Sequence, residues 1–414
     1  MTFEHCVKIK KLFLFRLILN NNYICIKFIK MKSQNYLFKL ILLIIPMLFI
    51  SCDNDDDDIT IPIVAPDNYE FLRDGSSTVS FSGQTARLNM ADEIYSALNK
   101  NTFTKSQLMT MFNDGTGFAG AGLDSSGKNV GGKTASGCLH GAMAVTKSRF
   151  TDMLTDFADN VIPTWSGTAA NGTAGLLTDS ARSINVNAVG WEVDQTFIKG
   201  IIGAMCVDQI VNNYLDPCQL DSGTRRDDNT NGVLSGSKNY TDMEHKWDEA
   251  FGYLYGQEAD AKRSDLGSAP TGNGTTLNKY FKKINDSNEP GLAVAVFDAF
   301  KLGRAAIVAG DYDVRDAQAK IIMIHLSKVV GYKAVDYLNS YMSKKSATPA
   351  DAIHALSEGY GFILSLMFTN DGTGKPYFSE AEVNTMLSKM SNFWTVKDSD
   401  LTTMVNDIKS KFNI

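Results

Sequence analysis

The stretch that decides the fold is residues 242–254, DMEHKWDEAFGYL, because the chain contains it twice. The second copy is residues 351–363, DAIHALSEGYGFI. Every position of the second copy follows its counterpart by 109 residues, as His354 follows His245. At this offset Asp, His, Glu and Gly coincide, aromatic residues pair with aromatic residues, and aliphatic with aliphatic. The chain therefore carries an internal repeat.

Both copies are predicted to be helical. Thr241 and Glu244 have the spacing of a capping box, and Thr348-Pro349 is typical of an N-cap followed by proline in the first turn. On a helix, the Asp, His and Glu of each copy lie within about 60° of one another, since each residue advances about 100°. Each copy therefore presents two carboxylates and an imidazole along one stripe.

A single stripe of this kind has a structural explanation. An aspartate in the first turn interacts favourably with the positive end of the helix dipole, and His and Glu one turn apart can form a local hydrogen bond. Two matched copies point instead to a paired function, although duplication also preserves packing residues. The candidate metal ligands are Asp242, His245, Asp248, Glu249, Asp351, His354 and Glu358. If the two motif helices face each other near a pseudo-twofold axis, His245, Glu249, His354 and Glu358 converge.

Composition sets the broad class of the protein. The 414 residues are 44% hydrophobic and 21% charged, with a formal net charge of −6, which suits one large or two moderate globular domains. Neither this mild acidity nor the distribution of basic residues after the first fifty supports nucleic-acid binding. We expect no nucleic-acid partner.

The N-terminal region has the order of a lipoprotein leader. Residues 1–30 indicate either a start codon placed too early, upstream of Met31, or a long n-region. Residues 31–52 follow the pattern of a signal peptide, a short basic region and an apolar core that ends at Ser51-Cys52, which resembles a bacterial lipobox. The apolar core is too short to span a membrane comfortably, and an uncleaved anchor is the alternative. Cys52 is the predicted lipidation site, through which the membrane becomes a partner.

Residues 53–66 begin with the acidic run DNDDDD, which predicts a solvated, disordered tether. Acidic residues next to a lipidated cysteine resemble the surface-export signals of certain Gram-negative lipoproteins. We expect an outer-membrane lipoprotein that is either periplasmic or exposed at the cell surface.

Three of the six cysteines lie beyond the leader, at Cys138, Cys206 and Cys218. At most one disulfide can form among them, either Cys206–Cys218 or a pairing with Cys138. Their spacing does not match a zinc site. Residues 131–134, GGKT, resemble the end of a phosphate loop, but the first glycine and the preceding strand are missing, so no nucleotide site is predicted there.

The remaining pattern predicts an all-α fold with a small N-terminal β-hairpin. Asp74-Gly75 between alternating runs indicates a hairpin with a type I′ turn over residues 69–81. Helical periodicity follows over residues 86–98, 106–112, 136–161, 191–215, 292–308, 316–342, 379–392 and 398–412. Tyr-Leu at 214–215 recurs at 337–338, after 123 residues. We expect two pseudo-twofold-related helical bundles, 67–258 and 259–414, each too small to bury its apolar faces alone.

The motif resembles a known group of proteins. The stretch from His245 to Glu258, within a duplicated helical lipoprotein, is similar to the imelysin-like proteins, whose signature is Gly-x-His-x-x-Glu before an aromatic, glycine-containing helix. More closely, segments 77–84, 199–204, the His245 motif and 303–307 together resemble a family of bacterial lipoproteins known as domain of unknown function 4856, over about residues 67–412.

The imelysin resemblance implies an iron-linked role at the cell envelope, two four-helix bundles and a metal site at the motif. Carried over to this chain, the histidine is His245, whereas Asp248 stands at the Glu position and Met243 at the Gly position. Glu249, which the second copy repeats as Glu358, is the alternative ligand.

These features predict a lipoprotein that binds iron, haem or another divalent metal in an uptake system, with outer-membrane uptake components as partners. Imidazole and carboxylate ligands suit iron or zinc. The structural alternative is a buried polar network that joins the repeats. The functional alternatives are a non-catalytic surface lipoprotein that binds glycans or proteins, which exposed tryptophans would favour, and a metallopeptidase-like hydrolase. The sequence lacks His-Glu-x-x-His and Gly-x-Ser-x-Gly, so we do not expect an enzyme.

Overall fold

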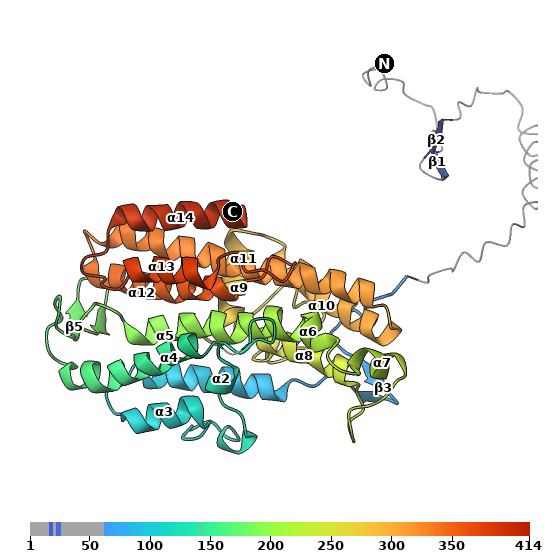
Figure 1. The fold of residues 1–414 in the computed structure, drawn as a ribbon, viewed down its shortest axis with the longest axis horizontal. Coiled ribbons are helices and arrows are strands. Elements are labelled where there is room, and N and C mark those ends of the chain that lie inside the picture. The colour runs from blue at the N-terminus through green and yellow to red at the C-terminus, as the bar shows by residue number, and fades with distance from the viewer. Residues whose placement is uncertain (1–15, 20–21, 26–61, 142) are drawn as a thin grey trace, which may run out of the picture. The chain divides into compact units, whose positions relative to one another are not determined.

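The computed structural model describes residues 16–19, 22–25, 62–141 and 143–414 (Figure 1). The predicted signal peptide, the lipidation site Cys52 and most of the predicted acidic tether lie outside the described residues. In the first unit of the chain, β1 (Arg16–Leu19) pairs antiparallel with β2 (Asn22–Cys25). The second compact unit is Ile63–Ile414.

The predicted hairpin opens this second unit. Strands β3 (Leu72–Arg73) and β4 (Ser76–Ser77) pair antiparallel. Asp74 and Gly75 between them have φ of 51° and 75°, the left-handed values that both central residues of a type I′ turn require. The hairpin prediction is confirmed.

Helices make up most of the unit, and the predicted all-α class is confirmed. The longer helices are α2 (Ser82–Ala97), α3 (Lys105–Asn113), α4 (Ala144–Asp156), α5 (Val193–Ile201), α8 (Asp242–Tyr255), α9 (Leu277–Ser287), α10 (Leu292–Ala309), α11 (Tyr312–Lys344), α12 (Pro349–Ser365), α13 (Glu380–Lys389) and α14 (Asp398–Phe412). Short helices α6 (Pro217–Leu220) and α7 (Arg225–Thr230) lie between the end of the α5 region and α8. A second hairpin, β5 (Gly175–Thr178) and β6 (Ser183–Val186), was not predicted.

Both motif copies are helical, and each begins as predicted. At α8 the Thr241 hydroxyl accepts a hydrogen bond from the Glu244 amide at 3.2 Å, and the Glu244 carboxylate accepts one from the Thr241 amide at 2.7 Å. Pro349 opens α12, where its missing N–H removes no helical hydrogen bond. Local capping chemistry therefore fixes the start of α8, whereas at α12 Thr348 forms no side-chain cap and the Ala350 and Asp351 amides donate to the distant Asp179, at 2.7 and 3.0 Å.

The prediction that a helix begins at residue 136 was wrong, because α4 starts at Ala144. The amides of Ser136 and Gly137 donate instead to the Asp208 carboxylate, at 3.0 and 2.7 Å. The Leu139 amide donates to the Asn212 carbonyl at 3.0 Å. These tertiary bonds hold the segment in a non-helical path of loop and turn, which local helical propensity cannot overcome.

The disulfide joins Cys138 to Cys218, and Cys206 is free and buried. The predicted alternative Cys206–Cys218 was therefore wrong, and the pairing with Cys138 is confirmed. Cys206 lies on the π-helical segment Ile202–Val207 that continues α5, where its side chain is enclosed by the core. Cys138 lies in the turn before α4 and Cys218 lies in α6, and their Cα atoms are 6.1 Å apart.

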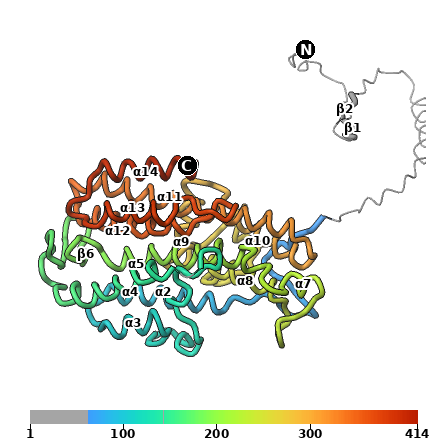
Figure 2. Tube along the Cα trace, viewed as in Figure 1, coloured from blue at the N-terminus to red at the C-terminus, as the bar shows by residue number. Residues whose placement is uncertain are grey.

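The two repeats share one hydrophobic core. In Figures 1 and 2, α5 runs between the helices of the first half, α2 and α4, and those of the second half, α11 to α14. α12 packs along both α11 and α5, whereas α8 packs against α2, α10 and the second π-helical segment, Ile210–Tyr214. The second motif helix therefore rests on a helix of the first repeat.

The repeated glycine of the motif explains how closely these helices pack. A Cβ on Gly361 would lie 2.4 Å from the Cβ of Lys199 on α5. A Cβ on Gly252 would lie 2.4 Å from the Cβ of Phe81, at the start of α2. Each motif helix therefore requires glycine at this position to pack this closely.

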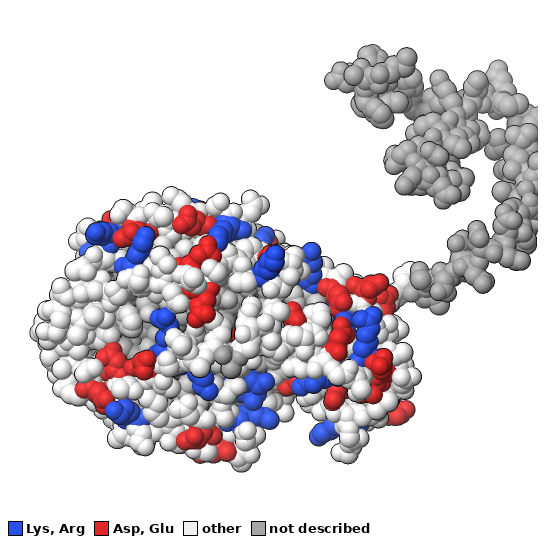
Figure 3. All heavy atoms as spheres, in the orientation of Figure 1, with Lys and Arg blue, Asp and Glu red and all other residues white. Residues whose placement is uncertain are grey.

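Within the described residues, no helix is both long enough and apolar enough to cross a membrane. On the face shown in Figure 3, acidic and basic side chains are interspersed, and a group of basic side chains gathers over α2.

Candidate functional site

Two repeated features that lie far apart in the sequence meet in space. Tyr214 lies beside Glu249 in the first repeat, and Tyr337 lies beside Glu358 in the second. Burial first, and then neighbouring groups that include the glutamate, raises the pKa of each tyrosine. The Tyr-Leu repeat and the motif repeat therefore build one Tyr–Glu pair in each half.

The same tyrosines stack on equivalent aromatic residues of the motif helices. The ring centroids of Tyr214 and Tyr253 are 6.0 Å apart, with planes inclined by 26°. Those of Tyr337 and Phe362 are 5.7 Å apart, inclined by 15°. Each glutamate consequently sits at the edge of an aromatic stack.

The structure does not bring the two motif histidines into one cluster. The start of α8 contacts α7 and the start of α12 contacts the β5–β6 hairpin, and these elements lie at opposite ends of the helical unit (Figure 1). Among the described residues, the hydrogen bonds and ion pairs of His354 and Glu358 share no partner with those of Glu249. Each repeat therefore has its own surroundings.

The second repeat forms what we call the acidic cluster: Glu192, Asp194, Lys199, His354 and Glu358. The His354 imidazole lies between two carboxylates, with Nδ1 2.6 Å from Glu192 Oε2 and Nε2 3.5 Å from Glu358 Oε2. The Lys199 ammonium lies 3.4 Å from Glu358 Oε1 and donates to Gln195 at 2.9 Å. Two carboxylates thus contact the imidazole, one of them also faces the ammonium, and the Asp194 carboxylate interacts electrostatically with Glu192 and Lys199.

This cluster is withdrawn from solvent. Glu192, Asp194, Lys199 and Glu358 are each less than a tenth exposed. Burial, followed by the charge of Glu192, raises the pKa of Asp194 well above its ordinary value. Buried negative charge of this kind is costly unless a cation or a proton neutralises it.

Sequence reasoning missed Glu192, Asp194 and Lys199. Glu192 is the N-cap residue of α5 and Asp194 lies in its first turn, where acidic residues are common for local reasons. Only the packing of α5 on α12 turns them toward His354, and there the Glu192 amide also donates to the Ser357 hydroxyl at 3.0 Å. No local sequence signal identifies that contact.

The first repeat has different neighbours. Glu249 pairs with Lys246, 2.5 Å away, and accepts a hydrogen bond from Gln84 at 2.9 Å. The His245 ring stacks on Tyr240, with centroids 4.7 Å apart, and its Nδ1 has no hydrogen-bond partner among the described residues. Burial lowers the pKa of His245. Cations, not further carboxylates, surround this glutamate.

Asp248 has a structural role. Its carboxylate accepts hydrogen bonds from Tyr69 at 2.8 Å and from Arg304 at 3.1 Å, and all three side chains are fully buried. Arg304 also pairs with Glu244 and donates to Thr78, so the network ties the β3–β4 hairpin to α8 and α10.

The two remaining aspartates are not gathered with the histidines. Asp351 pairs with Arg182 at 2.8 Å and with Lys344 at 3.0 Å. Asp242 is half-buried in the first turn of α8 and forms no side-chain hydrogen bond or ion pair with the described residues.

The candidate ligands do not form a metal centre in their present arrangement. Among the described residues, no group of three or more His, Cys, Asp and Glu side chains is arranged to hold a metal ion. In the acidic cluster the imidazole itself bridges Glu192 and Glu358, and the Lys199 ammonium faces Glu358. The imidazole and carboxylates of the acidic cluster are residue types that suit a divalent cation. The first repeat is less suited to a cation, because Lys246 already neutralises Glu249.

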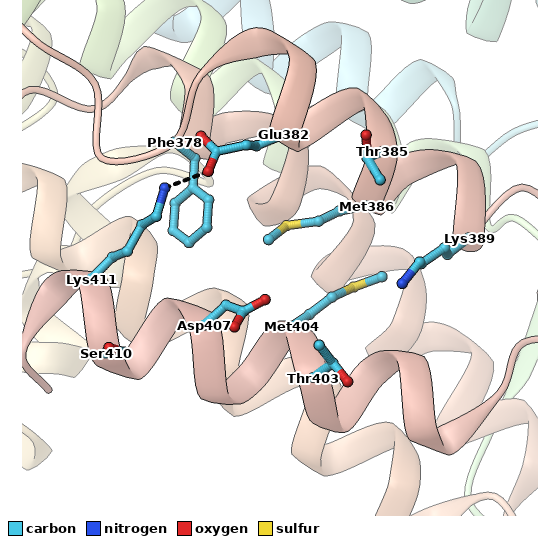
Figure 4. Close-up of a pocket in the computed structure, with 10 residues that line it drawn as sticks. All are labelled: Phe378, Glu382, Thr385, Met386, Lys389, Thr403, Met404, Asp407, Ser410 and Lys411. Atoms are coloured by element: carbon cyan, nitrogen blue, oxygen red, sulfur yellow. Dashed lines mark hydrogen bonds and ion pairs between the residues drawn. The ribbon is translucent and has the colours of Figure 1, made fainter.

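A pocket of about 450 Å³ opens elsewhere, between α13 and α14 (Figure 4). Phe378, Met386 and Met404 line its interior, and the Glu382–Lys411 ion pair closes one end. None of the repeated motif residues lines it.

Comparison with known proteins gives one match. The family model described as "Domain of unknown function (DUF4856)" matches residues 66–414. No curated protein and no solved structure matches the chain.

Proposed function

Since the chain belongs to the DUF4856 family, whose description names no activity, we propose from its geometry that it is a cell-envelope lipoprotein that binds a divalent metal ion, iron among them, at the acidic cluster. Glu192, His354 and Glu358 would hold the ion after their side chains turn away from their present contacts with one another, since they are not arranged as a metal group here. One observation carries the proposal: the buried Glu192 and Glu358 carboxylates meet a half-buried imidazole, and the buried Asp194 carboxylate lies near the Lys199 ammonium that faces Glu358.

Lys199 is the competitor of the metal in this proposal. Its ammonium supplies the positive charge that the ion would bring, through a contact to Glu358 that is long for an ion pair, 3.4 Å. Metal binding requires this ammonium to leave the carboxylate. The same competition does not arise in the first repeat, where the Lys246–Glu249 contact is short.

The test is a titration of the full, metal-free chain with Fe²⁺ and Zn²⁺ by calorimetry, with metal analysis after dialysis. His354→Ala and Glu358→Gln should weaken binding by at least roughly tenfold, as loss of metal-site residues does. Lys199→Met should strengthen it, because it removes the competing charge. Circular dichroism shows that each variant keeps its helices.

Glu249→Gln is the matched control, because Glu249 occupies the equivalent position of the first repeat. It should leave metal affinity unchanged. Absence of stoichiometric metal in the parent chain and in Lys199→Met would overturn the proposal, and so would equal losses in Glu249→Gln and Glu358→Gln. Either result would make the acidic cluster a structural network between the repeats.

The envelope location rests on the leader pattern and has its own test. Cys52→Ser should abolish lipid attachment and move the protein from the membrane fraction to the soluble fraction, as loss of an acyl anchor does. Mass spectrometry of the mature N-terminus reports the lipid directly. An unmodified Cys52 in the membrane-bound parent would contradict this part of the proposal.

The alternative of a glycan-binding surface gains no support from the tryptophans. Trp247 is fully buried, where its Nε1 donates to the Phe300 carbonyl at 3.0 Å. Trp165, Trp191 and Trp394 are half-buried and pack against the core. An exposed aromatic platform built from tryptophan is therefore not the feature to test first.

A further inference from the structure

The first repeat holds a group of half-buried basic side chains, which we call the basic cluster: Arg87, Lys128, Lys133 and Lys246. The Nζ atoms of Lys133 and Lys246 lie 5.3 and 5.6 Å from the centroid of the Tyr214 ring. Three separate parts of the chain supply the cluster: α2, the loop after α3, and α8.

Arg87 and Lys128 are placed together by the start of α2. Arg87 donates from Nε to the Asn129 carbonyl at 3.1 Å and from Nη1 to the Gly83 carbonyl at 3.3 Å. The position of a Cβ on Gly83 would lie 3.1 Å from Lys128 Cε and 3.7 Å from Arg87 Nη1.

The charges in this cluster are not balanced. Among the described residues, Glu249 is the one carboxylate that pairs with any of the four, through Lys246, whereas Arg87, Lys128 and Lys133 form no ion pair. Burial first, and then the neighbouring Arg87, lowers the pKa of Lys133. Holding several like charges together in a half-buried position is unfavourable unless an anion joins them.

A buried hydroxyl lies beside the cluster. The Tyr253 side chain is fully buried, its hydroxyl oxygen lies near Arg87, and the hydroxyl donates no hydrogen bond within the described part of the chain. Its ring stacks on Tyr214, next to the two lysine ammonium groups. Buried polar atoms normally find a partner, so this donor is available to a bound group.

We propose that the basic cluster binds an oxyanion, the phosphate or carboxylate group of a small molecule, through Arg87, Lys133 and Lys246. Recognition would come from side-chain cations and the Tyr253 hydroxyl. It does not require a phosphate loop, because residues 131–133 form a short 3-10 turn that follows a loop. Glu249 is the intramolecular competitor of the ligand, as Lys199 is in the acidic cluster.

Calorimetric titration of the full chain with inorganic phosphate and with citrate, at low ionic strength, tests the proposal. Lys133→Met should weaken binding about tenfold, as expected when one charge-assisted contact is lost. Glu249→Gln should tighten binding, because the competing carboxylate disappears. Saturable binding of citrate alone would assign a carboxylate ligand, and binding of phosphate alone a phosphate ligand.

Lys105→Met is the matched control, because it removes the same charge from an exposed lysine on α3 that pairs with Asp159. It should leave both affinities unchanged. If Lys133→Met fails to fold, Lys128→Met removes a neighbouring charge with the same expected direction. The proposal is overturned if neither anion binds saturably, or if Lys105→Met weakens binding as much as Lys133→Met.

Discussion

At the scale of single residues, the two motif glutamates occupy equivalent places beside a stacked tyrosine but have opposite neighbours. Glu249 is neutralised by Lys246 within a group of cations, whereas Glu358 faces Lys199 in a cluster that holds two further buried carboxylates. The repeated residues set the scaffold of each site. Residues outside the repeat set its charge, and with it the class of ligand.

His245 makes the stability of the protein depend on pH. Because burial places its folded-state pKa below its unfolded value of about 6.5, the unfolded chain binds more protons in this range. Its contribution to stability is complete above about pH 6.5 and is lost as the pH falls through the lower folded-state pKa. His245→Phe keeps the stacking on Tyr240 and should gain stability relative to the parent between pH 7.5 and pH 5.

Chemical denaturation of both proteins across this pH range measures the difference. A difference in unfolding free energy that stays constant with pH would show that His245 titrates alike in the folded and unfolded states.

The cysteines give a second residue-scale prediction. Replacing Cys138 and Cys218 together by serine should lower the unfolding free energy by about 2–5 kcal/mol, because the crosslink restricts the unfolded chain. Burial raises the pKa of the Cys206 thiol to about 12, so iodoacetamide at pH 8 should label Cys206 only after unfolding. Chemical denaturation measures the first effect and peptide mapping without reduction the second, and a Cys206-containing disulfide peptide would refute the pairing.

At the scale of elements, the sequence predicted the helix boundaries that neighbouring residues determine. The start of α8 follows from Thr241 and Glu244, and α14 begins and ends where its periodicity does. The sequence could not show that Ser136 and Gly137 bind Asp208, which delays α4, nor that Glu192 reaches His354. Those contacts depend on how helices pack, and the packing partners are distant in sequence.

The crossing of α12 over α5 depends on Gly361. Gly361→Ala should cost about 1–3 kcal/mol of stability, because its Cβ would overlap Lys199 and the backbone of Gly200. Gly359→Ala on the same helix is the control, since its Cβ would lie 3.3 Å from the movable end of Leu338. Thermal unfolding should separate the two variants. Equal effects would mean that helix propensity, not the close crossing, explains the glycine.

At the scale of the whole molecule, the repeats form one cooperative unit. The second motif helix packs on α5 of the first repeat, and both halves contribute to one core. Residues 63–414 should therefore unfold in a single calorimetric transition. Gly252→Ala and Gly361→Ala, one in each repeat, should shift that transition without splitting it. Two resolved transitions would indicate halves that fold independently.

The disulfide has a consequence for a cut chain. Cys138 and Cys218 are 80 residues apart, and the segment between them contains α4, the β5–β6 hairpin and α5. A protease that nicks the partly exposed turn at Arg182 therefore opens a covalent ring and does not release a fragment. On a gel the nicked protein runs as one species until a reductant is added, and then as two. Damage to this turn leaves every helix attached.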